Sequence, residues 1–421
     1  MKKIGLFLFG ICFVLQMVAQ EHNYFTNPVI RGDVPDPSVI RVEDTYYATG
    51  TSSEWAPFYP MFTSKDLVNW KQVGHVFTKQ PSWTSNSFWA PELFYHNNKV
   101  YCYYTARQKS TGISYIGVAT SDSPLHEFTD HGPIVEYGKE AIDAFIYDDN
   151  GQLYISWKAY GLDTRPIELL GCKLSADGLH LDGEPFTLLV DEKGIGMEGQ
   201  YHFKKGDYYY IVYAAHGCCG PSSDYDVYVA RARNYGGPYE KYSGNPILHG
   251  GEGDYKSCGH GTVVRTSDGR MFYMCHAYLK GDGFFIGRQP ILQEMEMTDD
   301  HWVRFQTGNL AIAEQPVPFV GTKQEPLSDF EDNFKGNQLK VDWTWNYPYS
   351  DIHAVLKKGK LFLSGTPKNN NKYGTALCLR PQSPQYSCET KVINTGKGLK
   401  GLTLYGDDKN LIAWGIEGDK L

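Results

Sequence analysis

Beyond its first twenty residues, the sequence has no apolar run long enough to cross a bilayer, and helical periodicity is nearly absent throughout. Basic residues are not in excess either: 40 lysines and arginines stand against 48 acidic residues, so the formal net charge is −8. This balance provides no electrostatic surface for nucleic acid and disfavours an anionic membrane surface. We therefore expect neither nucleic acid nor a membrane as a partner, and a neutral or cationic substrate.

The nine cysteines lack the repeated Cys-x-x-Cys spacing of zinc sites. The adjacent pair Cys218-Cys219 is either a vicinal disulfide or two free thiols in a loop, and the sequence leaves both open. Apart from Cys12, the others are interpreted as small buried hydrophobic residues.

The first twenty residues have the pattern of a targeting segment. Lys2 and Lys3 precede the almost wholly apolar stretch 4–18, and Val18-Ala19-Gln20 resembles a small-residue cleavage site. Residues 1–20 are therefore predicted to be a secretory signal peptide, and the mature net charge becomes 38 − 48 = −10. We expect an exported protein, either periplasmic or extracellular, in which a disulfide bond can persist.

Aromatic residues and glycine are abundant, with 31 Tyr and 44 Gly, which favours β structure. A turn followed by an aromatic and β-branched strand recurs five times: EDTYYAT, NNKVYCYYT, DNGQLYISW, KGDYYYIVY and DGRMFYMCH. The aligned positions are Tyr47, Tyr101, Tyr154, Tyr209 and Met271, which lie 54, 53, 55 and 62 residues apart. This period, with about four short strands per unit, predicts an all-β fold with a five-bladed β-propeller over residues 24–318.

The repeat also predicts a site. Eleven residues before each aligned position stand Asp36, Ala90, Asp143, Glu198 and His260, each at the start of its unit's first strand. Because the first strand of each blade lines the central channel, this register directs three carboxylates and a histidine at one point. The alternative is that some of them are structural acceptors for backbone N–H groups.

The loops after each second strand return to the same face. They contain Trp55 and Phe58, Arg107 and Gln108, Tyr160 and Arg165, His216 to Cys219, and Phe284 to Arg288. Aromatic rings there could stack on the apolar face of a pyranose, although solvated loops also carry incidental aromatics. Converging carboxylates suit glycosidic bond cleavage, which needs a protonated acid and an ionised partner.

The same stretches resemble glycoside hydrolase family 43. The strings NPVIRGDVPDPSVIRVEDTYY, SKDLVNW, FWAPELF, GVATSDSP, AIDAFIYDDNGQLY, MEGQYHF, GHGTVV and GRQPILQ match it in order, over about residues 27–325. The resemblance implies a five-bladed propeller that hydrolyses β-xylosides or α-L-arabinosides, generally with inversion.

The resemblance also implies residue roles. Asp36 would be the general base, Glu198 the general acid and Asp143 the residue that tunes the acid's pKa. Trp89 would form a pocket wall, Arg288 would contact substrate, and His260 would lie near a bound calcium ion or its waters. Trp55, Phe58, His260, Cys218 and Cys219 complete the predicted sugar-binding set. No cofactor is expected to be required, and a structural Ca²⁺ in the channel is the one metal considered.

The sequence departs from the family at two points, and both bear on sugar preference. Ala144 follows Asp143 where the family often has proline, and Gln200 stands where Glu-Gly-Pro is frequent. The HGCCGPSSDY loop is also not a general family feature.

The last hundred residues form a second unit in this interpretation. Residues 319–326 are a polar, proline-containing linker, and residues 327–421 contain short alternating strands. Their order resembles the C-terminal concanavalin-like β-sandwich of family 43 β-xylosidases. That domain is normally longer, so we expect either a fragment or a reduced domain.

These observations together predict an exported exo-acting β-xylosidase whose partner is a xylo- or arabino-oligosaccharide. An α-L-arabinofuranosidase or another exo-glycosidase is the first alternative. A catalytically silent glycan-binding propeller is the second, and it predicts loss of one of the three carboxylates. A retaining, fructan-acting propeller would need an Asn-Asp-Pro-Asn type opening, which is missing.

Overall fold

A computed structural model of the 421-residue chain describes residues 24–159, 166–393, 398–407 and 409–418. The predicted signal peptide therefore lies outside the described residues, as do Tyr160 and Arg165. Among the described residues, no helix has the length and apolar character needed to span a membrane. The only helix in this part of the chain is the short 3₁₀ segment η1 (Phe284–Ile286).

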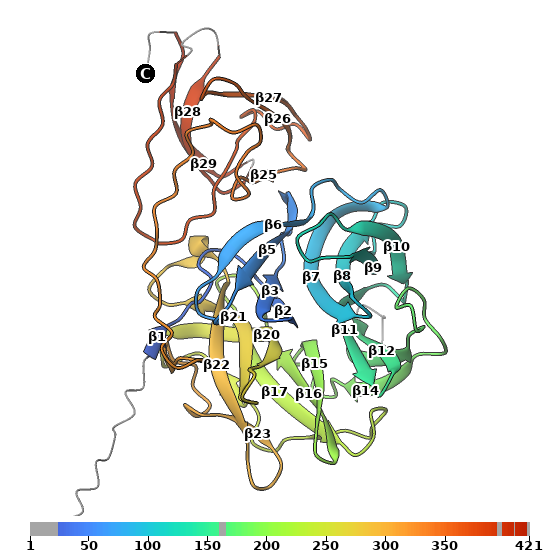
Figure 1. Ribbon diagram of the computed structural model, residues 1–421. Helices are drawn as coiled ribbons and strands as arrows, with labels where there is room; N and C mark the ends of the chain where they lie inside the picture. The colour runs from blue at the N-terminus through green and yellow to red at the C-terminus, as the bar shows by residue number, and fades with distance from the viewer. Residues whose placement is uncertain (1–23, 160–165, 394–397, 408, 419–421) are drawn as a thin grey trace, which may run out of the picture.

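Five antiparallel sheets surround a central axis, which confirms the predicted propeller (Figure 1). Blade 1 contains β2 (Ser38–Val42), β3 (Thr45–Thr49), β5 (Phe58–Ser64) and β6 (Lys71–Phe77). Blade 2 contains β7 (Thr84–His96), β8 (Lys99–Gln108), β9 (Ser114–Ser121) and β10 (Thr129–Val135). Blade 3 contains β11 (Ala141–Asp149), β12 (Gln152–Ala159), β13 (Glu168–Lys173) and β14 (Phe186–Val190).

Blade 4 contains β15 (Met197–Lys205), β16 (Tyr208–Ala215), β17 (Asp226–Ala232) and β18 (Glu240–Lys241), and β19 (Leu248–His249) also pairs with β17. Blade 5 contains β20 (Tyr255–Arg265), β21 (Met271–Leu279), β22 (Gln289–Met297) and β23 (Val303–Phe305). The first strand of each blade, β2, β7, β11, β15 or β20, lies innermost, as Figure 1 shows.

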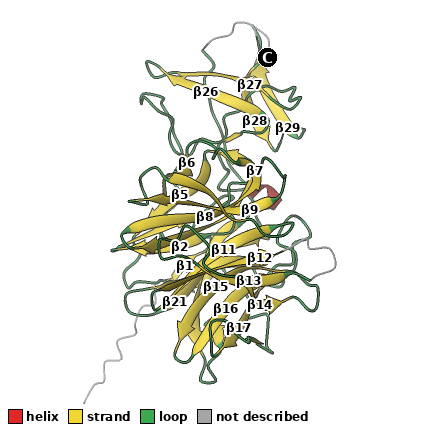
Figure 2. Cartoon of the chain, turned by 90° about the vertical axis from the view of Figure 1, so that its right-hand side faces the viewer, coloured by secondary structure: helices red, strands yellow, loops and turns green. Residues whose placement is uncertain are grey.

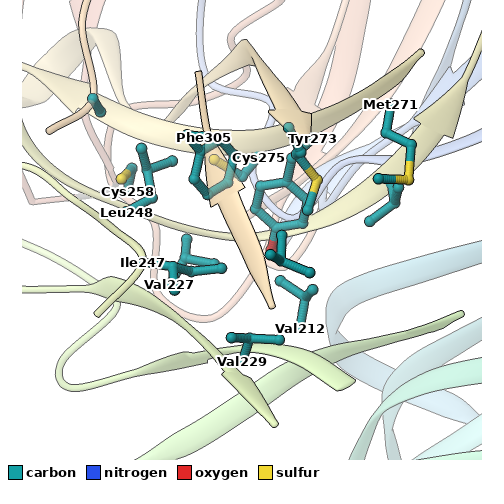
Figure 3. Close-up of a cluster of buried hydrophobic side chains, with 14 of the residues drawn as sticks. Val212, Val227, Val229, Ile247, Leu248, Cys258, Met271, Tyr273, Cys275 and Phe305 are labelled. Carbon is teal, nitrogen blue, oxygen red and sulfur yellow. The ribbon is translucent and has the colours of Figure 1, made fainter. Parts of the chain in front are cut away.

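The blades are held together by five buried hydrophobic clusters, one at each interface between neighbouring blades. Strand β21 is almost continuously apolar because both of its faces are buried. Tyr273 and Cys275 pack toward blade 4 (Figure 3), whereas Phe272 and Met274 belong to the cluster between blades 5 and 1. Because successive side chains of a strand point to opposite faces, a strand buried on both sides needs apolar residues at every position. This explains the absence of helical periodicity.

The ring is closed by the N-terminal segment. Strand β1 (Tyr24–Thr26) pairs with β24 (Glu314–Pro316), which follows blade 5. The side chain of Asn27 then exchanges two hydrogen bonds with the backbone of Leu292 in β22, at 2.9 and 2.8 Å. Since β2 begins eleven residues later, at Ser38, these contacts fix the start of blade 1 against blade 5.

The C-terminal part lies beside the propeller (Figure 2). Its strands form β25 (Trp345–Asn346), the hairpin β26 (Ser350–Leu356)–β27 (Leu361–Pro367) and the hairpin β28 (Lys400–Tyr405)–β29 (Leu411–Ile416). β25 pairs with β4 (Trp55–Ala56) of the propeller. The predicted β-sandwich is thus only partly present in the described residues, as separate two-stranded sheets.

Candidate active site

The candidate site is built on a backbone feature that recurs at the inner edge of every blade. One residue there has a left-handed φ: Asp36 (54°), Ala90 (36°), Asp143 (59°), Gly199 (60°) and His260 (48°). In blades 2 to 5 this residue lies where the pairing of the first two strands is interrupted by a bulge. Bulges redirect side chains, and those of Asp143 and His260 come close together, with 3.8 Å between Asp143 Oδ2 and His260 Nδ1.

The backbone N–H groups at these positions bond to side chains of the preceding blade, because a bulge leaves them unpaired within the sheet. Ala90 N donates to Thr51 Oγ1 at 2.7 Å and Asp143 N to Thr105 Oγ1 at 3.2 Å. Gly199 N donates to Asp143 Oδ2 at 3.1 Å. The inner edges of the blades are therefore linked around the axis.

Glu198 departs from the predicted register by one residue. The hairpin pairs Asp149↔Gln152 and Lys205↔Tyr208 show that Tyr154 corresponds to Tyr210, not to Tyr209. Counting back eleven residues from Tyr210 gives Gly199. The prediction that Glu198 is equivalent to Asp143 was therefore wrong, although its side chain does reach the same region.

Position 199 is occupied by glycine for a steric reason. A Cβ there would lie 2.5 Å from Cγ of His260, and the φ of 60° already disfavours any other residue. The close approach lets Gly199 donate to Asp143 while Glu198, one residue earlier, contacts a different set of partners.

Asp36 is surrounded by nitrogen atoms of one arginine and two histidines. Its Oδ1 lies 3.3 Å from Arg288 Nη1, 3.5 Å from His260 Nδ1 and 3.1 Å from His276 Nδ1, and its Oδ2 accepts from Thr51 Oγ1 at 2.6 Å. Burial by itself would raise the pKa of Asp36, but Arg288, His260 and His276 together hold it well below its usual range. Asp36 is therefore ionised at neutral pH.

Asp143 has the opposite character. Its Oδ2 lies 3.8 Å from His260 Nδ1 and accepts the Gly199 N–H. Burial raises the pKa of Asp143 to about 6, with a further contribution from the negative charge of Glu198 and opposition from His260. The site thus holds one carboxyl group that is charged at neutral pH and one that retains a proton in mildly acidic solution.

Glu198 is bound on both oxygens. Oε2 lies 2.5 Å from Lys158 Nζ, and Oε1 accepts from the hydroxyl of Tyr225 at 2.8 Å. Burial would raise the pKa of Glu198, yet the charge and hydrogen bond of Lys158 and the bond from Tyr225 lower it. Because Glu198 and Asp143 interact, their protons titrate as those of a pair.

Sequence reasoning missed Lys158, Tyr225, His276 and Thr51. Lys158 pairs with Ile142 in β11, directly before the bulge at Asp143, and it is a buried cation in a mostly apolar strand. His276 is the same kind of exception in MFYMCHAYL. A buried ionisable residue in an apolar strand is the signal that could have found both.

The arrangement can perform acid–base chemistry on a glycosidic bond, since it combines an ionised carboxylate with a carboxyl pair that holds one proton. The model of the family Glycosyl hydrolases family 43 matches residues 25–303. The chain belongs to glycosyl hydrolase family 43. It is therefore a glycosidase.

Relatives with curated names extend the comparison over most of this family 43 chain. A xylan 1,3-β-xylosidase from Vibrio sp. is 28% identical, over 90% of this chain and 76% of its own length. A non-reducing end α-L-arabinofuranosidase from Bacteroides ovatus is also 28% identical, over 97% of this chain and 78% of its own length. The solved structure of the family 43 protein BlXynB from Bacillus licheniformis aligns with a TM-score of 0.71 at 25% identity, over 86% of this chain and 72% of that one.

The residues predicted to bind sugar in this family 43 enzyme lie in different environments. Arg288 contacts Asp36, and Trp89 is half-buried next to the bulge at Ala90. Trp55 is half-buried in β4, and its ring meets Tyr405 of the C-terminal part edge-on at 5.9 Å.

Phe58 requires a correction. Its side chain is only 2% exposed and packs between Phe88 and Tyr347, with ring centroids 4.2 and 5.0 Å away. The sequence places Phe58 near the correct loop, but strand alternation turns its ring into the interface of blades 1 and 2. It has no face left for a sugar.

Direct calcium binding by His260 does not fit the geometry. Its Nδ1 faces Asp36 and Asp143, and calcium takes six to eight oxygen ligands. Within the described ranges no group of three or more histidine, cysteine, aspartate or glutamate side chains could hold a metal. A calcium ion held through water in the channel stays a prediction.

The structure resolves the alternative at Cys218 and Cys219 in favour of a disulfide bond. Cys102, Cys172, Cys258 and Cys275 are buried free thiols, as predicted, whereas Cys378 is half-buried and Cys388 is exposed.

Proposed function

We propose that this protein is an exported, exo-acting family 43 β-xylosidase that inverts the anomeric centre. In this proposal Asp36 is the general base, Glu198 the general acid and Asp143 the residue that tunes the acid. The xylo-oligosaccharide substrate would place its scissile bond between Asp36 and Glu198.

The observation that carries the proposal is the division of charge among the three carboxyl groups. Arg288 keeps Asp36 ionised, as a base that activates water requires. The pair Asp143–Glu198 retains a proton up to about pH 6, the value to which the pKa of Asp143 is raised. A glycan-binding propeller without activity would not need this division, and none of the three carboxylates is lost.

The choice of xylose rests on the Vibrio relative named xylan 1,3-β-xylosidase. The relative from Bacteroides ovatus named α-L-arabinofuranosidase has the same identity and supports the second candidate, an α-L-arabinofuranosidase. Export is supported by the pattern of residues 1–20 and by the Cys218–Cys219 disulfide, since such bonds persist in oxidising compartments.

Initial rates on aryl β-xyloside, aryl α-L-arabinofuranoside and aryl β-galactoside test the proposal, with Asp36→Asn as the inactive control. We expect the highest kcat/KM on the xyloside. Preference for the arabinofuranoside would replace the first candidate by the second. Equal background rates for the wild type and Asp36→Asn on all three substrates would overturn the glycosidase assignment of this site.

A further inference from the structure

The loop that carries the Cys218–Cys219 disulfide is connected to the proposed acid at both ends. It joins β16 to β17; Ala214 in β16 pairs with Glu198, and Tyr225 at the far end donates its hydroxyl to Glu198 Oε1. The disulfide therefore lies in a loop that begins and ends beside this carboxylate.

The loop is rigidly held. Gly217 N donates to Asp224 Oδ1 at 2.8 Å, and Ser223 Oγ donates to the carbonyl oxygen of Cys218 at 3.1 Å. Gly220 N donates to the hydroxyl of Tyr278 at 3.0 Å, which connects the loop to the end of β21 in blade 5. Cys218 is half-buried and Cys219 is exposed, so the disulfide presents one side to solvent.

Two exposed aromatic rings lie in the loop that follows β21. Phe284 packs against the Tyr278 ring at 4.9 Å and is 41% exposed, and Phe285 is 59% exposed. Both precede Arg288, which binds Asp36. Cys219, Tyr278, Phe284, Phe285 and Arg288 line one continuous cleft, and Arg288 connects this cleft to the carboxylate site through its contact with Asp36.

We propose that the Cys218–Cys219 disulfide, Tyr278, Phe284 and Phe285 form an apolar platform that binds the sugar on the leaving-group side of the scissile bond. The inference rests on the proposed function. Its occupant is a pyranose or furanose ring, because the platform offers flat apolar groups beside hydrogen-bonding loops, and it adjoins the acid that protonates the leaving oxygen. The disulfide between two adjacent cysteines closes a small ring with the backbone that joins them. This ring can contact a sugar because it is apolar and needs no hydrophobic core to support it.

The test compares a substrate that reaches the platform with one that does not. Xylobiose places a sugar on the leaving-group side, whereas xylosyl fluoride has a single-atom leaving group. For Phe285→Ala and for the double variant Cys218→Ser with Cys219→Ser, we expect the ratio of kcat/KM on xylobiose to that on xylosyl fluoride to fall about 3- to 10-fold, mainly through KM. The matched control is Tyr95→Ala. Tyr95 is also an exposed aromatic residue, but it lies next to the β7–β8 turn of blade 2, at the end of β7 away from the bulge at Ala90.

Reduction provides a second measurement. Dithiothreitol, a dithiol, transfers two electrons and two protons to the bond, giving two thiols and its own cyclic disulfide. It should raise the KM of the wild type for xylobiose and leave the KM of the double serine variant unchanged. Unchanged ratios in both Phe285→Ala and the serine variant overturn the platform.

Failure of the proposed function looks different. If the wild type hydrolyses arabinobiose and not xylobiose, the same ratio is measured with arabinobiose and arabinosyl fluoride. If it hydrolyses neither, the function proposal fails, and calorimetric titration of xylobiose and arabinobiose then decides the platform. Weaker binding by Phe285→Ala supports the platform as a glycan site, and equal or undetectable binding overturns it.

Discussion

Nζ of Lys158 lies 2.5 Å from Oε2 of Glu198, so the carboxyl group proposed as the acid is ion-paired in the ligand-free protein. An acid catalyst must carry a proton when the leaving oxygen departs. In the free enzyme that proton is stabilised on Asp143, whose pKa is raised to about 6, while the pKa of Glu198 is lowered. For Glu198 to act as the proposed acid, substrate binding must shift the proton within the Asp143–Glu198 pair toward Glu198.

This arrangement sets the expected pH dependence. The acidic limb of kcat/KM reports Asp36, whose lowered pKa keeps the base ionised even in acid. The alkaline limb reports loss of the shared proton, which follows the raised pKa of Asp143 at about 6. We expect optimal kcat/KM below neutrality. A profile that is flat from pH 5 to pH 8 would contradict the proton-sharing pair.

Replacing Lys158 by methionine should move the alkaline limb to higher pH. The ammonium group lowers the pKa of Glu198, so its removal raises that pKa and the acid stays protonated in more basic solution. A pH series of kcat/KM on an aryl glycoside measures the shift, and circular dichroism confirms that the fold is retained. A limb that keeps its position or moves to lower pH would show that Lys158 does not lower the pKa of Glu198.

Replacing Asp143 by asparagine should move the alkaline limb in the opposite direction. The mutual repulsion of the two carboxylates favours a bound proton, and without it Glu198 is left with Lys158, Tyr225 and His260, which all lower its pKa. The same pH series detects the change. If the limb keeps its position, Asp143 acts only by orienting Gly199 through their 3.1 Å hydrogen bond.

Much of the fold was predictable from the sequence because blades 1 to 4 repeat a two-residue hairpin turn between their first two strands, and blade 5 has a longer turn at the same place. Asp36 and Asp143 were located correctly at the axis since their backbone conformation repeats with the blade. Glu198 was found through an alignment that was wrong by one residue. Tyr209 and Tyr210 are both tyrosines, and the sequence does not show which of them corresponds to Tyr154.

Other residues could not be predicted from the repeat. Lys158, Tyr225 and His276 each occur in one blade only, so no register identifies them. The burial of Phe58 depends on Tyr347, a residue 289 positions later that packs on it from the C-terminal part. Such contacts exist only once the chain has folded.

Gly199→Ala should destabilise the protein more than Gly206→Ala does. Both glycines have a φ near 60°, at 60° and 58°, so both variants carry the same backbone cost of about 1 kcal/mol or more. Only at position 199 would the new Cβ meet another residue, His260 at 2.5 Å, whereas nothing lies within 4 Å at position 206. Thermal denaturation of the two variants isolates the contribution of the clash, and equal losses would show that His260 moves aside freely.

Replacing Glu198 by glutamine should separate substrates by their leaving groups. An amide cannot donate the proton, so hydrolysis of an oligosaccharide, whose alcohol leaving group needs protonation, should fall by about 10²–10⁴-fold. An aryl glycoside with an acidic phenol needs little protonation and should be affected far less. Asp36→Asn is the matched control, because loss of the base should lower the rate of hydrolysis of both substrates by a similar factor. Equal losses of the two substrates in Glu198→Gln would exclude Glu198 as the acid, and Lys158 and Tyr225 would then hold a carboxylate that only binds the sugar.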